Sequence, residues 1–147
     1  MGEREIQEKV VEYLKSHRVM TLATVTPEGK PLAHTVKYAS DGMTMFFITM
    51  KSTRKAQNIL NNPLVALTVD EDYDDWLVIQ GVQMEAKATI LSEQEEIGRA
   101  AGIYMAKYPF VADFPPNPEI VFVKVEPTAG FFLDYSKGFT HKDAITC

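Results

Sequence analysis

The chain has 147 residues, of which 46% are hydrophobic and 24% are charged. This length and composition are typical of one globular domain with a sizeable core, and no second domain is expected. The net charge of −5 argues against general nucleic-acid binding, which needs a basic surface.

The only cysteine is Cys147, so the chain can form neither an intramolecular disulfide nor a thiolate metal cluster. A reducing compartment suits such a chain. No apolar run approaches the ~18 residues of a membrane span, and residues 1–5 are too charged to begin a signal peptide. We therefore expect a cytoplasmic protein with no membrane partner.

An amphipathic helix is predicted over residues 4–17, because apolar residues recur on one helical face. These residues are Ile6, Val10, Tyr13 and Leu14. Three segments with strand-like alternation follow, separated by turn signals at residues 27–29 and 40–42. The segments are residues 18–25, 31–39 and 43–50. We expect an antiparallel meander with the helix across one of its ends.

The third of these strands leads through a cationic turn, residues 51–55 (KSTRK), into a short helix. Either hydroxyl of the turn can cap this helix. Ala56, Ile59 and Leu60 have the spacing of its inward face. The helix is expected to end before Pro63, which cannot continue it.

Positive charge at this turn is unfavourable for the helix, because a helix N-terminus favours Asp or Glu. Free backbone N–H groups, the hydroxyls of Ser52 and Thr53, and the cations Arg54 and Lys55 together match a phosphate site. The alternative is a set of solvated charges beside an ordinary cap, at a cost of roughly 0.3–1 kcal/mol per charge. The charge pattern alone leaves both interpretations open.

In the second half of the chain, residues 64–69 form a fourth predicted strand. Residues 76–91 form a long one that bends or bulges at Gly81. The acidic stretch between them, residues 70–75, lacks the Gly and Glu of a calcium loop. We interpret it as a solvated loop.

Ser92 and Glu95 indicate the capping box of a second inserted helix, which should end at Pro109. Its predicted buried face consists of Ile97, Ala101, Tyr104, Met105 and Tyr108. An irregular crossing, residues 109–118, leads to two last strands and a polar tail that is free to fray. These segments are residues 119–126, 129–135 and 136–147. Seven strand candidates joined by turns, with few helices, predict a mainly β (α+β) antiparallel barrel.

Three motifs follow one another in the cationic stretch with fixed spacing. They are Phe47-Ile48-Thr49, Thr53-Arg54-Lys55 and Asn61-Asn62-Pro63. In this order the chain resembles the FMN-binding split-barrel family typified by pyridoxamine 5′-phosphate oxidase, whose members carry an aromatic-rich strand, Ser-Arg-Lys and a helix closing with Asn-Asn-Pro. The resemblance covers roughly residues 18–135.

The resemblance implies a six- or seven-stranded split barrel over residues 1–147 that forms a homodimer, with FMN bound between protomers. It implies an FMN-dependent oxidoreductase that moves hydride or electrons to or from a small-molecule substrate or electron donor. The implied cofactor-binding residues are His34, Thr35, Val36, Lys37, Ile48, Thr49, Ser52, Thr53, Arg54, Lys55 and Gln83, with Gln80 as an alternative to Gln83. Arg54 and Lys55 correspond to the family's phosphate ligands.

Departures from the family pattern argue against vitamin B6 oxidation. Leu32 or Ala33 stands where the oxidases have a phosphate-binding Arg, and Tyr108 replaces the Arg of their substrate-binding Tyr…Arg-Pro segment. The usual C-terminal substrate-binding Arg and His are not recognisable. The chain is therefore expected to be a looser relative of the oxidases.

His17, His34 and His141 are far apart and lack companion carboxylates at ligand spacing, so no metal site is expected. His34 is either a polar residue on an outward strand face or a flavin contact. Lys37 would stabilise negative charge on a reduced flavin. No acid–base catalyst is assigned. A non-catalytic flavin carrier or sensor, and a barrel that binds F420 or haem, remain alternatives.

Overall fold

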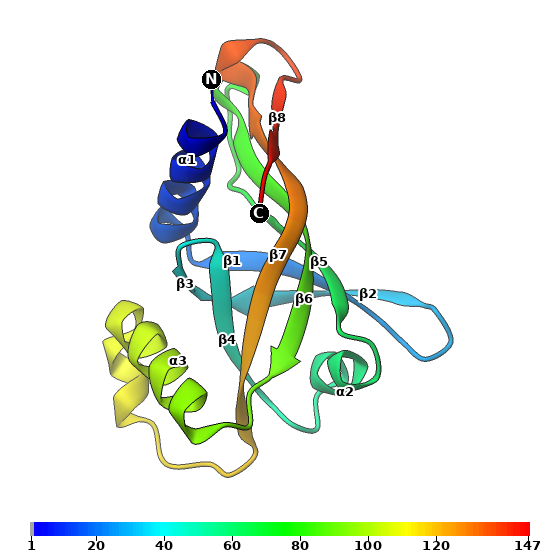
Figure 1. Cartoon of the computed structure of the whole chain (residues 1–147), viewed down its shortest axis with the longest axis vertical. Helices are drawn as coiled ribbons and strands as arrows, with labels where there is room; N and C mark the ends of the chain where they lie inside the picture. Colours follow the sequence, from blue (N-terminus) through cyan, green and yellow to red (C-terminus); the bar gives the residue numbers. More distant parts are fainter. Residues whose placement is uncertain (1) are drawn as a thin grey trace.

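The computed structural model describes residues 2–147. Within this range eight strands form one antiparallel sheet that curls into a half barrel, with the order β2-β1-β5-β6-β7-β4-β3 and with β8 paired to β7 (Figure 1). The strands are β1 (Val19–Val25), β2 (Pro31–Lys37), β3 (Ala39–Asp41), β4 (Thr44–Met50), β5 (Leu64–Val69), β6 (Gln80–Ile90), β7 (Ile120–Asp134) and β8 (Lys142–Ile145). The helices are α1 (Glu3–Ser16), α2 (Arg54–Asn61) and α3 (Gln94–Lys107). The mainly β split-barrel class is confirmed.

The barrel is split where two strands from opposite ends of the sheet meet. β2 ends the sheet on one side, and β4 lies beside β3 on the other. The two strands approach each other without a hydrogen-bonded ladder between them. Because β2 has no strand partner on its outer edge within residues 2–147, its free backbone groups face this split.

A single apolar cluster fills the inside of the half barrel. Alternate residues of each strand point inward, and α1 covers one end with its predicted face. Leu14, Leu22, Phe47 and Val82 are among the side chains with at most 1% of their surface exposed. Burial of each such side chain contributes about 1.5–3 kcal/mol, which makes this cluster the main source of stability.

The short helix α2 begins at the N-cap residue Thr53, as the hydroxyls of the turn predict. Its orientation differs from the prediction, because Leu60 is 65% exposed while Asn58 is buried with Ala56 and Ile59. The Asn58 carboxamide donates a hydrogen bond to Thr24 of β1, and this contact turns the helix so that Leu60 faces outward. The prediction that Leu60 lies inward is therefore wrong.

The predicted strand over residues 76–91 begins later than expected. A single 3₁₀ turn, η1 (Trp76–Val78), precedes β6, and Asp75 caps it by accepting from the Leu77 N–H. The register shift in β6 lies between Glu85 and Ala86 and not at Gly81. The residues opposite explain it, since β7 carries Pro127 there, which has no N–H for the ladder.

The last two predicted strands form one continuous strand, β7, which pairs with β6, β4 and β8. The strand passes through Pro127 because Thr128 is left out of the register with β6. Gly130 allows a close approach, since a Cβ at this position would lie 2.3 Å from the backbone oxygen of Gln83. A glycine is therefore required at position 130, where β7 lies close against β6.

The N-cap residue of α3 is Glu93, which makes no side-chain cap, so the predicted capping box of Ser92 and Glu95 is not formed. Its fully buried residues are Ala100 and Tyr104, and the other predicted positions within it are only half-buried. α3 and the following 3₁₀ helix, η2 (Pro109–Asp113), cover the outer side of β3 and β4. Tyr108 is buried between them, as predicted.

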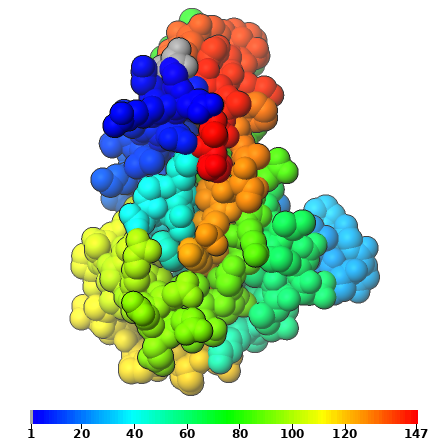
Figure 2. Space-filling view, viewed as in Figure 1, coloured from blue at the N-terminus to red at the C-terminus, as the bar shows by residue number. Residues whose placement is uncertain are grey.

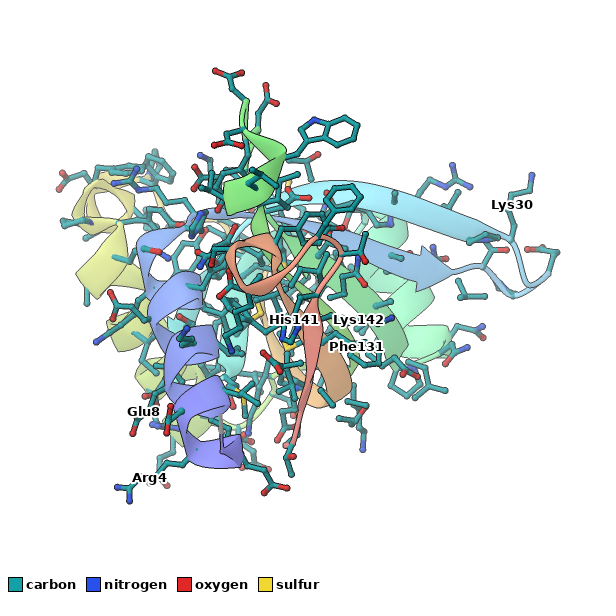
Figure 3. All side chains as sticks on the ribbon, turned by 90° about the horizontal axis from the view of Figure 1, so that it is seen from above. Arg4, Glu8, Lys30, Phe131, His141 and Lys142 are labelled. Atoms are coloured by element: carbon teal, nitrogen blue, oxygen red, sulfur yellow. The ribbon has the colours of Figure 1, made fainter. Side chains whose placement is uncertain are left out.

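The C-terminal residues fold back onto the sheet. A 3₁₀ turn, η3 (Tyr135–Lys137), leads to β8, in which Ile145 is only 5% exposed. Lys142 of β8 lies 4.3 Å from the centre of the Phe131 ring (Figure 3). The expectation of a flexible tail over residues 136–147 therefore does not hold for β8.

At the other side of the molecule the hairpin between β1 and β2 projects from the body (Figure 2), with Lys30 at its tip (Figure 3). No helix within residues 2–147 is long and apolar enough to cross a membrane.

Candidate functional site

The turn before α2 is held by a small set of hydroxyl contacts. The Thr53 hydroxyl accepts from the Ala56 N–H at 3.3 Å and donates to the Met50 carbonyl at 2.8 Å. The buried Thr49 hydroxyl lies 3.0 Å from it. Since the single hydroxyl proton of Thr53 is donated to the Met50 carbonyl, the Thr49 hydroxyl is the donor to the Thr53 oxygen. These contacts fix the backbone at the positive end of the helix.

Arg54 and Lys55 begin α2, and no acidic residue lies in its first turn. Arg54 is exposed and Lys55 is half-buried. Neither has an ion-pair partner among residues 2–147. Two unpaired cations at a helix N-terminus raise the energy of the free protein, and an anion bound there would lower it.

His34 of β2 lies beside these two cations. Burial, and then the charges of Lys55 and Arg54, lower the pKa of its imidazole. The ring is half-buried, and its Nε2 lies 2.8 Å from the Thr24 hydroxyl. With a pKa below the ordinary value of about 6.5, His34 is neutral at pH 7.

Two residues that sequence reasoning missed connect β2, β1 and α2. Thr24 is 0% exposed and Asn58 is 6% exposed. The Asn58 amide donates to the Thr24 hydroxyl at 3.0 Å, and Thr24 in turn contacts His34. A signal for both exists in the sequence, since Thr24 continues the inward alternation of Met20 and Leu22. Asn58 lies between two apolar positions of a short helix.

The other predicted cofactor residues are divided between two surfaces. Ser52 is exposed on the cationic turn, whereas the Val36 side chain is part of the core and leaves only its backbone for a ligand. Thr35 is exposed on the outer face of the sheet, opposite Thr21. Gln83 lies on this face of β6 and lines a cavity that does not include Arg54 or Lys55.

A second cationic region lies where β2 and β4 meet α3 and η2. It is a cavity of about 460 Å³ that contains two predicted cofactor residues, Lys37 and Ile48. Its other charged residues, Arg18 and Lys107, were not predicted. Its aromatic lining comes from Tyr104, Tyr108, Phe110 and Phe114. A cavity with aromatic walls and three cations suits a planar ligand that carries negative charge.

Lys107 is part of the packing at this cavity. Its Nζ donates to the carbonyls of Leu14 and His17, close to the end of α1, and lies 4.5 Å from the centre of the Tyr38 ring. Burial, and then the charge of Arg18, lower the pKa of Lys107 to about 8. Its ammonium therefore caps the C-terminal end of a helix at the edge of a ligand-sized cavity.

The two tyrosines of this cavity are fixed by backbone contacts. The Tyr104 hydroxyl donates to the Lys37 carbonyl at 3.2 Å, and burial raises the pKa of Tyr104 to about 12. The Tyr108 hydroxyl donates to the Tyr38 carbonyl at 2.5 Å. Tyr108 therefore supports the fold near β2.

A third cavity, of about 350 Å³, lies on the outer face of the sheet. Short side chains line it, among them Thr21, Ala23 and Ala66, together with Gln83 and the 38% exposed Phe131. Among residues 2–147, all the residues that line this cavity belong to strands β1, β5, β6 and β7. No group of three or more His, Cys, Asp or Glu in the same range could hold a metal ion.

Residues 6–134 match the family model described as pyridoxamine 5′-phosphate oxidase. The chain belongs to this family. It is 32% identical to General stress protein 26 of Bacillus subtilis (strain 168) over 127 residues, which are 86% of this chain and 87% of that protein. The family prediction made from the cationic stretch is thereby confirmed.

Solved structures of family-like proteins have the same fold. A conserved hypothetical protein from Mycobacterium tuberculosis superposes with a TM-score of 0.76 at 26% identity, over 93% of this chain and 87% of that one. HutZ, the heme storage protein from Vibrio cholerae, superposes with a TM-score of 0.72 at 16% identity, over 83% of this chain and 89% of that one. At this identity the second likeness concerns the fold alone.

Proposed function

We propose that this protein is an FMN-binding flavoprotein that acts as an oxidoreductase on a small molecule. The observation that carries the proposal is the unpaired cationic pair Arg54 and Lys55 at the N-terminus of α2, next to the neutral imidazole of His34. This donor set suits a phosphate dianion, because free helix N–H groups and two cations lie at the same end of one helix.

The remaining donors extend from this point along the split of the barrel. Arg54, Lys55 and Thr53 would hold the phosphate, and the backbone of β2 and the Thr49 region would hold the rest of the cofactor. Bound FMN would supply hydride or electron transfer. Lys37 would stabilise negative charge on a reduced ring, and the cavity that it lines would admit the substrate or electron donor.

A homodimer and a cytoplasmic location belong to the same proposal. The uncovered outer face of the sheet, with Gln83 and Phe131, offers a second copy an apolar surface of small side chains. A dimer through this face would bring Gln83 to a site shared between protomers. Sedimentation at micromolar concentration should give a dimer, and a monomer that retains flavin would contradict this part of the proposal.

Haem is the second candidate ligand, since a heme storage protein shares the fold. A haem needs an axial ligand, usually an imidazole. Here His34 Nε2 is already hydrogen-bonded to Thr24, and no other histidine lies near the split. We therefore place FMN first. The visible spectrum of the purified protein distinguishes flavin from haem and from F420.

The test of the phosphate site compares FMN with riboflavin, which lacks only the phosphate. Arg54→Ala and Lys55→Ala should each weaken FMN by about 10- to 150-fold, because a charge-assisted hydrogen bond is worth roughly 1.5–3 kcal/mol. Riboflavin affinity should barely change. Titration followed by flavin fluorescence gives both dissociation constants.

Lys30→Ala is the matched control, since Lys30 is an exposed cation at the tip of the projecting hairpin. It should leave both affinities unchanged. Equal losses for FMN and riboflavin in the Arg54 and Lys55 variants, or no loss for either ligand, would show that the turn is not a phosphate site.

A further inference from the structure

The contact chain His34–Thr24–Asn58 restricts where the imidazole proton of His34 can lie. Asn58 donates to the Thr24 oxygen at 3.0 Å, and His34 Nε2 lies 2.8 Å from the same oxygen. A hydroxyl has a single proton to donate. Thr24 is fully buried and has no other partner within residues 2–147, so this proton has one acceptor in reach, His34 Nε2.

The competing arrangement has Nε2 as the donor, so that Thr24 accepts two hydrogen bonds. The Thr24 proton would then be buried without an acceptor, at a cost of about 1–3 kcal/mol. An Nε2–H on a doubly protonated ring would add a third cation beside Arg54 and Lys55, the two charged groups that act on His34 from α2. β1 offers only the neutral Thr24 at this point.

We propose that Asn58 and Thr24 are positioning residues that hold His34 in its neutral Nδ1–H form, so that a neutral N–H donor stands beside Arg54 and Lys55. Nδ1 has no partner among residues 2–147, and its proton is therefore available to a ligand. The role of this N–H group as a donor to phosphate rests on the proposed function, whereas the position of the proton does not.

The arrangement has a consequence for recognition. The site offers a phosphate two permanent cations and one donor that is neutral at pH 7 and above. Between pH 7 and pH 8, FMN affinity should then vary only through the second ionisation of the phosphate itself, whose pKa is about 6. A His34 released from Thr24 would gain a proton as the pH falls and would add its own pH dependence.

The position of the proton can be measured directly in the free protein. The chain has three histidines, so ¹⁵N imidazole shifts in a ¹⁵N-histidine-labelled sample are assignable with one His34→Gln variant. We expect the shifts of a neutral ring protonated at Nδ1 at pH 7.5. A ring protonated at Nε2 would overturn the proposal without any need for a variant.

Three variants test the two positioning residues. Thr24→Val keeps the shape but removes the donor to Nε2, and should raise the pKa of His34 by about 0.5–1 unit. Thr24→Ser should restore the wild-type titration. Asn58→Asp provides an acceptor that draws the Thr24 proton away, and should move the proton of His34 to Nε2 and raise its pKa further. An unchanged titration in both Thr24→Val and Asn58→Asp would contradict the proposal.

The same variants separate this inference from the proposed function. If Thr24→Val shifts His34 but Arg54→Ala leaves FMN affinity unchanged, the positioning role stands and the phosphate site fails. If both hold, Thr24→Val should make FMN binding tighter at pH 6 relative to pH 8 than in the wild type. Thr24→Ser should keep the pH dependence of the wild type. A purely structural defect would weaken FMN binding equally at pH 6 and pH 8.

Discussion

Two cationic regions of the molecule hold positive charge in different ways. At the cationic turn, Arg54 and Lys55 begin a helix, have no ion-pair partner within residues 2–147 and bear on the neutral His34. At the aromatic cavity beneath α3, Lys107 is packed against Tyr38 and donates to backbone carbonyls near the end of α1. One region keeps its cations free, and the other uses a cation to join two helices.

The difference separates recognition from support. Cations at a helix N-terminus oppose its dipole, so the fold gains nothing from Arg54 and Lys55 until an anion binds. A cation near a helix C-terminus interacts favourably with the dipole and with its last carbonyls, as Lys107 does. Loss of the cationic side chains should therefore affect ligand binding in the first region, whereas loss of the Lys107 side chain removes donors to backbone carbonyls and should lower stability in the second.

The largest expected effect on stability is that of Lys107→Met. The His17 carbonyl loses its donor, whereas the Leu14 carbonyl keeps the Tyr38 hydroxyl at 2.7 Å. The free energy of unfolding should fall by about 1–3 kcal/mol, as measured by urea denaturation. Lys37→Met is the matched control at the same cavity and should change stability by less than about 0.5 kcal/mol. Equal effects in the two variants would show that Lys107 supports the fold no more than Lys37 does.

The pH dependence of the free energy of unfolding gives a second test of Lys107. The pKa of Lys107 is about 8 in the folded protein, against 10.5 for an ordinary lysine. Between about pH 8 and pH 9, below the pH at which the buried tyrosines oppose it, the unfolded chain binds more protons at Lys107 than the folded one, so the free energy of unfolding should rise with pH. Below about pH 8 both states hold the proton, and this contribution is constant. The rise should vanish in Lys107→Met, and its persistence there would assign it to another group.

The smallest expected effect is on the cationic turn. Arg54→Ala and Lys55→Ala should leave the free energy of unfolding unchanged or raise it by roughly 0.3–1 kcal/mol, because each removes a charge opposed to the helix dipole. Urea denaturation in phosphate-free buffer measures this. A loss above about 1 kcal/mol in either variant would mean that these cations support the fold, and the contrast with Lys107 would disappear.

Local patterns were sufficient for most of the fold. The four apolar residues predicted to face inward from the first helix are all buried, and alternate residues of β6 from Val82 to Ala88 lie in the core. These features depend on spacing along the chain. Leu60 was misplaced because the orientation of α2 depends on the hydrogen bond from Asn58 to Thr24, which lies 34 residues away.

The candidate site also has a part that local sequence patterns predict and a part that depends on residues distant in sequence. The motif around Arg54 and Lys55 is continuous in sequence, and the structure brings His34 to it across the sheet. The aromatic cavity combines Arg18 with residues of α3 and η2, which are distant in sequence, and no local pattern joins them. β7 was predicted as two strands because Pro127 usually ends one, whereas a register shift lets it pass.

The single long strand β7 also governs when the site can exist during synthesis. The whole cationic turn has been synthesised once translation reaches Asn58. The strand that leads into the turn, β4, pairs only with β3 and β7 within residues 2–147. At ~5–20 residues per second the ribosome needs roughly 4–15 s more to supply β7. During that interval the nascent chain carries an exposed apolar strand and no assembled site.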